Sequence, residues 1–77
     1  MSVFDSLMDN IHEALMNDKR TAGAQIYVIT QQGIVTLTGV VPSNKIAEAA
    51  EEIASHQEGV IKVVNSLKIQ TKEVNNV

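Results

Sequence analysis

The sequence predicts an α+β fold, a two-layer α/β sandwich in which both helices cover one face of a mixed three-stranded sheet. Apolar residues recur at helical spacing over residues 2–17 and 45–57, and β-rich runs occupy residues 25–30, 34–41 and 60–69. The element order is therefore α-β-β-α-β. A crossover helix between the second and third strands should be right-handed and bring them together in parallel, while the first strand pairs antiparallel with the second.

The first helix is predicted over residues 2–17 by an apolar stripe at i, i+3, i+4 and i+7 spacing. Ser2 is its expected N-cap, and Asp5 lies in the first turn, where a negative charge suits the helix dipole. The stripe could also insert into lipid, but a core this small needs it for packing on the sheet. Its members are Phe4, Leu7, Met8, Ile11, Ala14 and Leu15.

A hairpin is predicted to join the first two strands through a three-residue loop at 31–33. Such loops commonly combine a type I turn with a left-handed residue, and Gly33 can take that conformation without a Cβ clash. Gly33 is therefore expected to set the register of the hairpin. Pro42 should end the second strand, because it cannot donate a ladder hydrogen bond.

The second helix is predicted from about Lys45 to Gln57, with Ser43 or Asn44 as its N-cap. Gly59 follows its end, where a left-handed residue closes many helices. Small alanines on the apolar stripe should let this helix lie close to the sheet. The stripe comprises Ile46, Ala49, Ala50, Ile53 and Ala54, and the outward acidic residues are Glu48, Glu51 and Glu52.

The third strand, over residues 60–69, completes one domain that spans residues 1–70 and leaves residues 71–77 as a flexible C-terminal tail. Glycine inside a strand costs stability unless a bulge or a close approach needs the missing side chain, so we expect another part of the chain to pass over Gly39. Asn65 has the inward phase of its strand, and its amide should satisfy loop backbone groups.

Strand alternation separates the side chains that face the helices from those on the uncovered face of the sheet. The inward set is Ile26, Val28, Val35, Leu37, Val63, Leu67 and Ile69. The outward set is Tyr27, Ile29, Thr36, Thr38, Val40, Lys62, Val64 and Lys68. A sheet face left in water normally carries polar residues, so the apolar outward set predicts a contact surface. β-Propensity alone also places single Ile and Val residues on surfaces, and the sequence leaves both interpretations open.

The order and spacing of several short motifs resemble the BON domain, a family of small domains in bacterial envelope and stress proteins. The motifs are Ile26-x-Val28, the turn at Gly33, Val35-x-Leu37-x-Gly39, Ala49-Ala50, Gly59-Val60 and Val63-x-Asn65-x-Leu67. Each motif is weak alone, but their order is specific, and Gly39 stands where the family has its characteristic glycine. We interpret Gly33, Gly39 and Gly59 as structural.

This resemblance implies a non-catalytic binding and interaction module, since family members are associated with phospholipid surfaces or with partner domains. Family members are usually periplasmic or membrane-attached, often with tandem copies of the domain. This chain departs from that pattern, with one copy, no signal sequence and a net charge of −3. We therefore expect a cytoplasmic protein, or a periplasmic one if a leader has been removed.

Composition narrows the classes of partner and site. Binding of nucleic acid or anionic lipid draws on clustered Lys and Arg, whereas the six bases of this chain are scattered. This argues against nucleic acid and disfavours phospholipid. Because the chain has no cysteine, neither a disulfide nor a thiolate metal site can form.

No cluster of residues has the spacing that catalysis requires, so we expect no enzyme activity, no cofactor and no metal. Helix-borne metal ligands recur at i+3 and i+4 spacing, but a solvated polar face has the same pattern. The residues with that spacing on the first helix are Asp5, Asp9, His12 and Glu13. A small cation held by backbone carbonyls would leave almost no trace in the sequence.

The function that the sequence favours is self-association, or docking of a protein partner, through the open face of the sheet. The alternatives are peripheral binding to a phospholipid surface, as in the family, and binding of a small cation. The residues expected to form the interaction face are Tyr27, Ile29, Thr36, Thr38, Val40, Lys62 and Val64.

Overall fold

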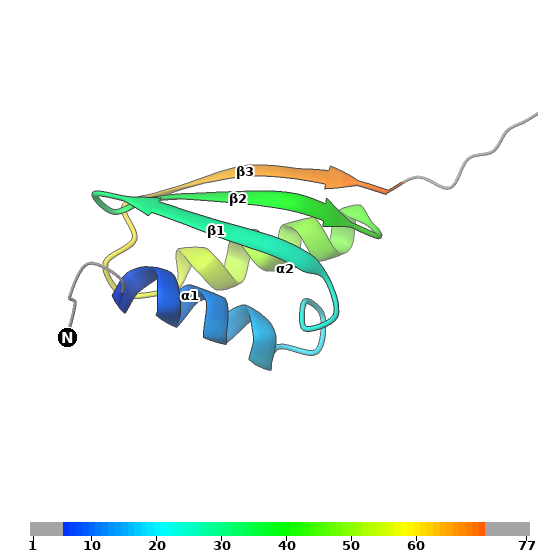
Figure 1. The fold of residues 1–77 in the computed structure, drawn as a ribbon, viewed down its shortest axis with the longest axis horizontal. Helices are drawn as coiled ribbons and strands as arrows, with labels where there is room; N and C mark the ends of the chain where they lie inside the picture. Colours follow the sequence, from blue (N-terminus) through cyan, green and yellow to red (C-terminus); the bar gives the residue numbers. More distant parts are fainter. Residues whose placement is uncertain (1–5, 71–77) are drawn as a thin grey trace, which may run out of the picture.

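The computed structural model describes residues 6–70 and shows two helices packed on one face of a three-stranded sheet (Figure 1). The helices are α1 (Ser6–Asn17) and α2 (Asn44–Ser55), and the strands are β1 (Gln25–Gln31), β2 (Ile34–Val41) and β3 (Lys62–Ile69). The central strand β2 is antiparallel to β1 and parallel to β3. The predicted α+β fold, element order and mixed sheet are confirmed.

The first helix ends at Asn17 as predicted, whereas its predicted start, with Ser2, Phe4 and Asp5, lies outside the described residues. The predicted tail at 71–77 lies outside them too. Thr21 closes the connection from α1 to β1, because its buried Oγ1 donates to the Leu15 carbonyl at 2.6 Å. Neither helix within residues 6–70 has the length and apolar character needed to cross a membrane.

The hairpin between β1 and β2 is tighter than predicted. Gln31 pairs with Ile34, so the loop consists of the two residues Gln32 and Gly33. Both have positive φ, +52° and +84°, which is the combination of a type I′ turn and matches the twist of the strands. The three-residue loop was wrong because it reserved the left-handed conformation for glycine, whereas Gln32 adopts it as well.

The helix α2 begins one residue earlier than predicted, at Asn44, and ends two residues earlier, at Ser55. Ser43 is the N-cap, and its Oγ accepts a hydrogen bond from a first-turn N–H at 3.4 Å. The prediction that Gly59 closes the helix was wrong, because Ser55 is the last helical residue and Gly59 (φ +99°) lies in the following turn. The side chains of Ser55 and Gln57 instead donate to carbonyls of the last helical turns, at 2.9 and 3.2 Å.

The core lies between the helices and the inner face of the sheet. Gly39 of β2 has a φ of +128°, and a Cβ at this position would collide with the backbone carbonyl of Gln25 on β1. The expected close approach is therefore present, and the neighbouring strand makes it. The fully buried apolar side chains include Ile11, Val35, Leu37 and Val41.

The start and end of β3 are more exposed than predicted. The strand begins at Lys62 instead of Val60, so Ile61 precedes the sheet and is 78% exposed. Ile69 has the inward phase, opposite Val41, yet it is 38% exposed at the last position of the strand. The remaining inward residues are buried or half-buried, as the alternation predicts.

Asn65 joins β3 to α2. Its Nδ2 donates to the Ala47 carbonyl and to the Glu51 carboxylate, both at 3.1 Å, while its Oδ1 accepts from the Leu67 N–H at 3.1 Å. The predicted inward orientation is present. The prediction of loop partners was wrong, because α2 supplies the two acceptors and β3 itself supplies the donor.

Candidate interaction surface

The face of the sheet turned away from α1 and α2 is covered by no element of residues 6–70 (Figure 1). Strand alternation and register place four rows of three side chains on this face. We call these residues the open face. From the hairpin end, the rows are Gln31, Ile34 and Lys62; Ile29, Thr36 and Val64; Tyr27, Thr38 and Ser66; and Gln25, Val40 and Lys68.

The open face exposes more apolar surface than a solvated sheet normally does. Tyr27 is 61% exposed, Ile29 55%, Val40 45% and Val64 37%. Ile34 is 42% exposed and extends this surface toward the hairpin. Ile34 was missing from the predicted interaction face. Strand alternation identifies it nevertheless, because it lies two residues before Thr36 on β2 and therefore faces the same side. The other predicted members, Thr36, Thr38 and Lys62, lie on the same face.

A further exposed hydrophobic residue stands beside the hairpin loop. The N–H of Ile61 donates to the Gly33 carbonyl at 2.7 Å, and a Cβ on Gly33 would come within 2.7 Å of the Ile61 Cδ1. The loop is thus held against the residue that leads into β3. No feature of the sequence indicates this exposure, because Ile61 has the inward phase if the strand is extended to Val60.

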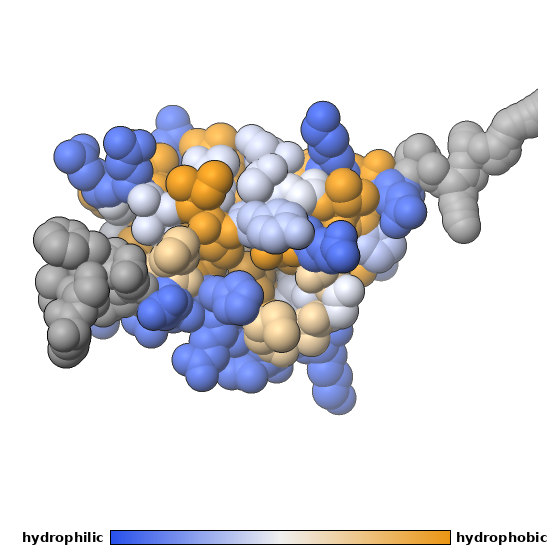
Figure 2. Space-filling model, in the orientation of Figure 1, coloured by the Kyte–Doolittle hydropathy of each residue, from blue (hydrophilic) through white to orange (hydrophobic). Residues whose placement is uncertain are grey.

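Charge is divided between the two layers of the domain. The open face has Lys62 and Lys68 and no acidic residue, so it is locally positive although the chain has a net charge of −3. In Figure 2, apolar and weakly polar surface gathers over the middle of the strands, with hydrophilic groups toward both ends of the sheet and along the outer side of the helix layer. The exposed acidic residues of the helices and of the α2–β3 connection are Asp9, Glu13, Glu48, Glu51, Glu52 and Glu58.

A groove of about 350 Å³ lies between α1 and the edge strand β1. Its walls combine apolar side chains with Asp9 and His12, two of the residues with metal-ligand spacing. Asp5 lies outside the described residues, and within residues 6–70 no three His, Asp or Glu side chains gather as metal ligands. The remaining lining residues are Met8, Ile26, Tyr27 and Val28.

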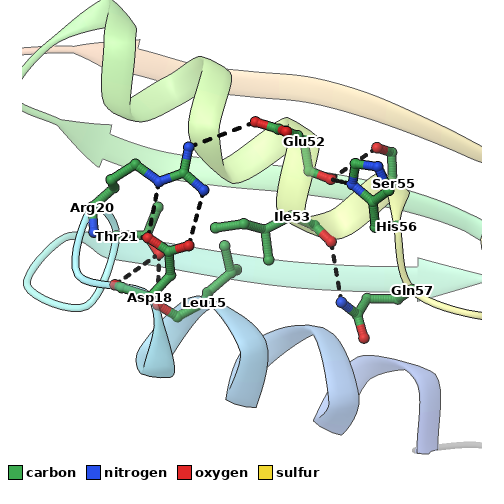
Figure 3. A network of polar contacts seen from close by, with 9 residues as sticks. All are labelled: Leu15, Asp18, Arg20, Thr21, Glu52, Ile53, Ser55, His56 and Gln57. Carbon is green, nitrogen blue, oxygen red and sulfur yellow. Dashed lines mark hydrogen bonds and ion pairs between the residues drawn. The ribbon is translucent and has the colours of Figure 1, made fainter.

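A second groove, of about 330 Å³, lies between the two helices and contains paired charges (Figure 3). Arg20 donates through Nε and Nη2 to the two carboxylate oxygens of Asp18, at 3.0 and 2.9 Å. These side-chain bonds, with a backbone bond from the Arg20 N–H, lower the pKa of Asp18 to about 2. Nη1 of Arg20 lies 3.6 Å from a Glu52 carboxylate oxygen, so the network ties the α1–β1 connection to α2.

The family model of the BON domain matches residues 5–71, which is most of the chain. The chain belongs to the BON family. A comparison with curated proteins finds no significant match. The resemblance to the BON family identified in the sequence is confirmed. Because BON domains are generally non-enzymatic modules, the family suggests a non-catalytic binding module.

The open face of this BON domain offers chemistry suited to binding. Its centre combines apolar side chains with the hydroxyls of Thr36 and Thr38 on β2, and its four corners are amides and ammonium groups. The corner residues are Gln25, Gln31, Lys62 and Lys68. An apolar centre with a polar rim is the usual anatomy of a protein interface.

Proposed function

We propose that this BON domain is a non-catalytic docking module whose open face binds a protein surface. The proposal rests on the contiguity of the exposed apolar side chains. Ile29 and Val64 flank Thr36 in one row, and Tyr27 lies in the next row on the same strand as Ile29. Single exposed hydrophobic residues need no explanation, whereas a contiguous patch indicates a contact site.

Position-specific photo-crosslinking tests this function in cells where the chain is native. A photoreactive residue replaces Thr36 on the open face, and Glu51 on the exposed surface of α2 serves as the matched control. Discrete protein adducts from position 36, with none from position 51, are expected. The adducts should disappear in a variant with Tyr27→Glu and Val64→Glu. Equal adducts from both layers, or adducts that persist in the folded double variant, would contradict the proposal.

A phospholipid surface is the second candidate partner, favoured by the local charge of the open face. Lys62 and Lys68 lie on a face without acidic residues, and each Lys near an anionic membrane contributes about 1 kcal/mol. Co-flotation with anionic and neutral vesicles at low salt tests it, with Lys62→Gln, Lys68→Gln as the control variant. Absence of binding to anionic vesicles would exclude this candidate.

A further inference from the structure

We propose that the partner of the open face is a second copy of this chain, packed sheet on sheet about a two-fold axis that runs along β2. The inference rests on the proposed function of the open face and specifies its partner. In this arrangement β2 lies over β2 of the second copy, and β3 of each copy lies over β1 of the other. The open face then has to be complementary to itself.

The register of the strands makes the open face complementary to itself. A two-fold axis parallel to the strands leaves the position along the strand unchanged, so each row meets the same row of the second copy. Val64 then lies over the partner's Ile29, and Thr36 over its own counterpart. Ser66 lies over the partner's Tyr27.

The corners of the face are complementary as well. Lys62 lies over the partner's Gln31, and Lys68 over the partner's Gln25, so each ammonium meets an amide oxygen that can accept a hydrogen bond. Sheets that pack face to face are about 10 Å apart and rotated by about 30°. The long lysine side chains can span the offset that this rotation creates at the corners.

Two other arrangements of the same face are less favourable. A two-fold axis across the strands puts β3 on β3 and brings Lys62 beside the partner's Lys68 twice, which opposes association. Stacking of the open face on α2 of another copy pairs opposite charges. It also removes Glu48 and Glu51 of α2 from water against a face whose centre is apolar, and burying a carboxylate costs free energy even when a lysine pairs with it.

The size of the face predicts a weak dimer. Strands of eight residues and a width of three strands give a footprint of about 25 by 15 Å, roughly 400 Å² per copy. Stable specific complexes bury about 800 Å² per partner. Association should therefore depend on concentration, and we expect it at high micromolar protein and above.

Single-cysteine crosslinking tests the geometry, since the chain has no cysteine of its own. The reagent is a bismaleimide whose reach matches the spacing of about 10 Å between packed sheets. Thr38→Cys, on the two-fold axis, should link to itself and give a dimer. Ser66→Cys, on β3, should link poorly alone, and a mixture of Val64→Cys with Ile29→Cys should give a mixed dimer. A thermal melt of each variant checks that it is folded.

The other results separate the inference from the function it rests on. Equal self-linking of Thr38→Cys and Ser66→Cys, or a link between Thr38→Cys and Glu51→Cys, would overturn the proposed axis. Absence of self-linking, while the photoreactive residue at position 36 reaches a different protein, would overturn the dimer and leave the docking function standing. Absence of adducts in both experiments, with binding to anionic vesicles, would overturn both in favour of lipid.

Discussion

Successive residues of β2 meet opposite environments, and the two faces of this strand differ in what they contribute. Val35 and Leu37 are completely buried against the helices, whereas Thr36 and Thr38 are half-buried on the open face. Both faces use residues that favour strands, so β-propensity does not distinguish them, whereas the alternation of side chains along the strand does. The buried side chains of the inner face supply most of the stability that this strand contributes. The outer face is therefore free to take residues that serve contact.

The largest expected loss of stability comes from a substitution on the inner face of β2. Leu37→Ala removes a fully buried side chain and should lower the free energy of unfolding by about 2–5 kcal/mol, which leaves a domain of this size close to unfolded. Thr36→Ala, the adjacent residue on the open face, should lower it by less than about 1 kcal/mol. Urea and thermal unfolding compare them. Similar losses of unfolding free energy in the two variants would show that both faces of β2 contribute equally to stability.

Gly39→Ala should cost somewhat less, about 2–3 kcal/mol, because the new Cβ meets the Gln25 carbonyl at a backbone φ that side chains rarely adopt. Gly23→Ala is the matched control, since a Cβ there has no atom within 4 Å. Comparison of the free energies of unfolding of Gly39→Ala and Gly23→Ala tests this prediction. A Gly39→Ala variant as stable as the control would mean that β1 can shift away from β2.

Asn65→Ala is expected to lower the free energy of unfolding by about 1–2 kcal/mol, because it removes the hydrogen bonds that join β3 to α2. Ser66→Ala changes the next residue, on the open face, and should be nearly neutral. Hydrogen exchange at β3 amides should speed up in the first variant alone. Equal exchange rates in both would show that packing holds β3 without this amide.

The sequence predicts the two faces of the sheet better than the ends of its strands. Burial leaves a periodic pattern, and the alternation through Val35 and Leu37 was sufficient to assign the inner face. The hairpin loop could not be predicted in the same way, because a positive φ at Gln32 depends on the twist of the paired strands. The exposure of Ile61 likewise follows from where β3 begins, which is set by the turn before it. The division of charge between the layers follows from the same alternation, because the outward strand residues include Lys62 and Lys68 and no acidic residue.

The smallest expected effect concerns the helix layer, where Arg20 lowers the pKa of Asp18 to about 2 from an ordinary value of 3.8. A carboxyl whose folded pKa is depressed adds stability above its unfolded pKa, and that stability is lost as pH falls through the folded pKa. Wild type should therefore be slightly more stable than Asp18→Asn at pH 5, and the difference should vanish toward pH 2. Unfolding measured across this window, with Lys68→Gln on the open face as the control variant, checks it. A difference that stays constant with pH would mean that the charge of Asp18 does not contribute to stability. The surface charges of the helix layer would then matter as little for folding as those of the open face.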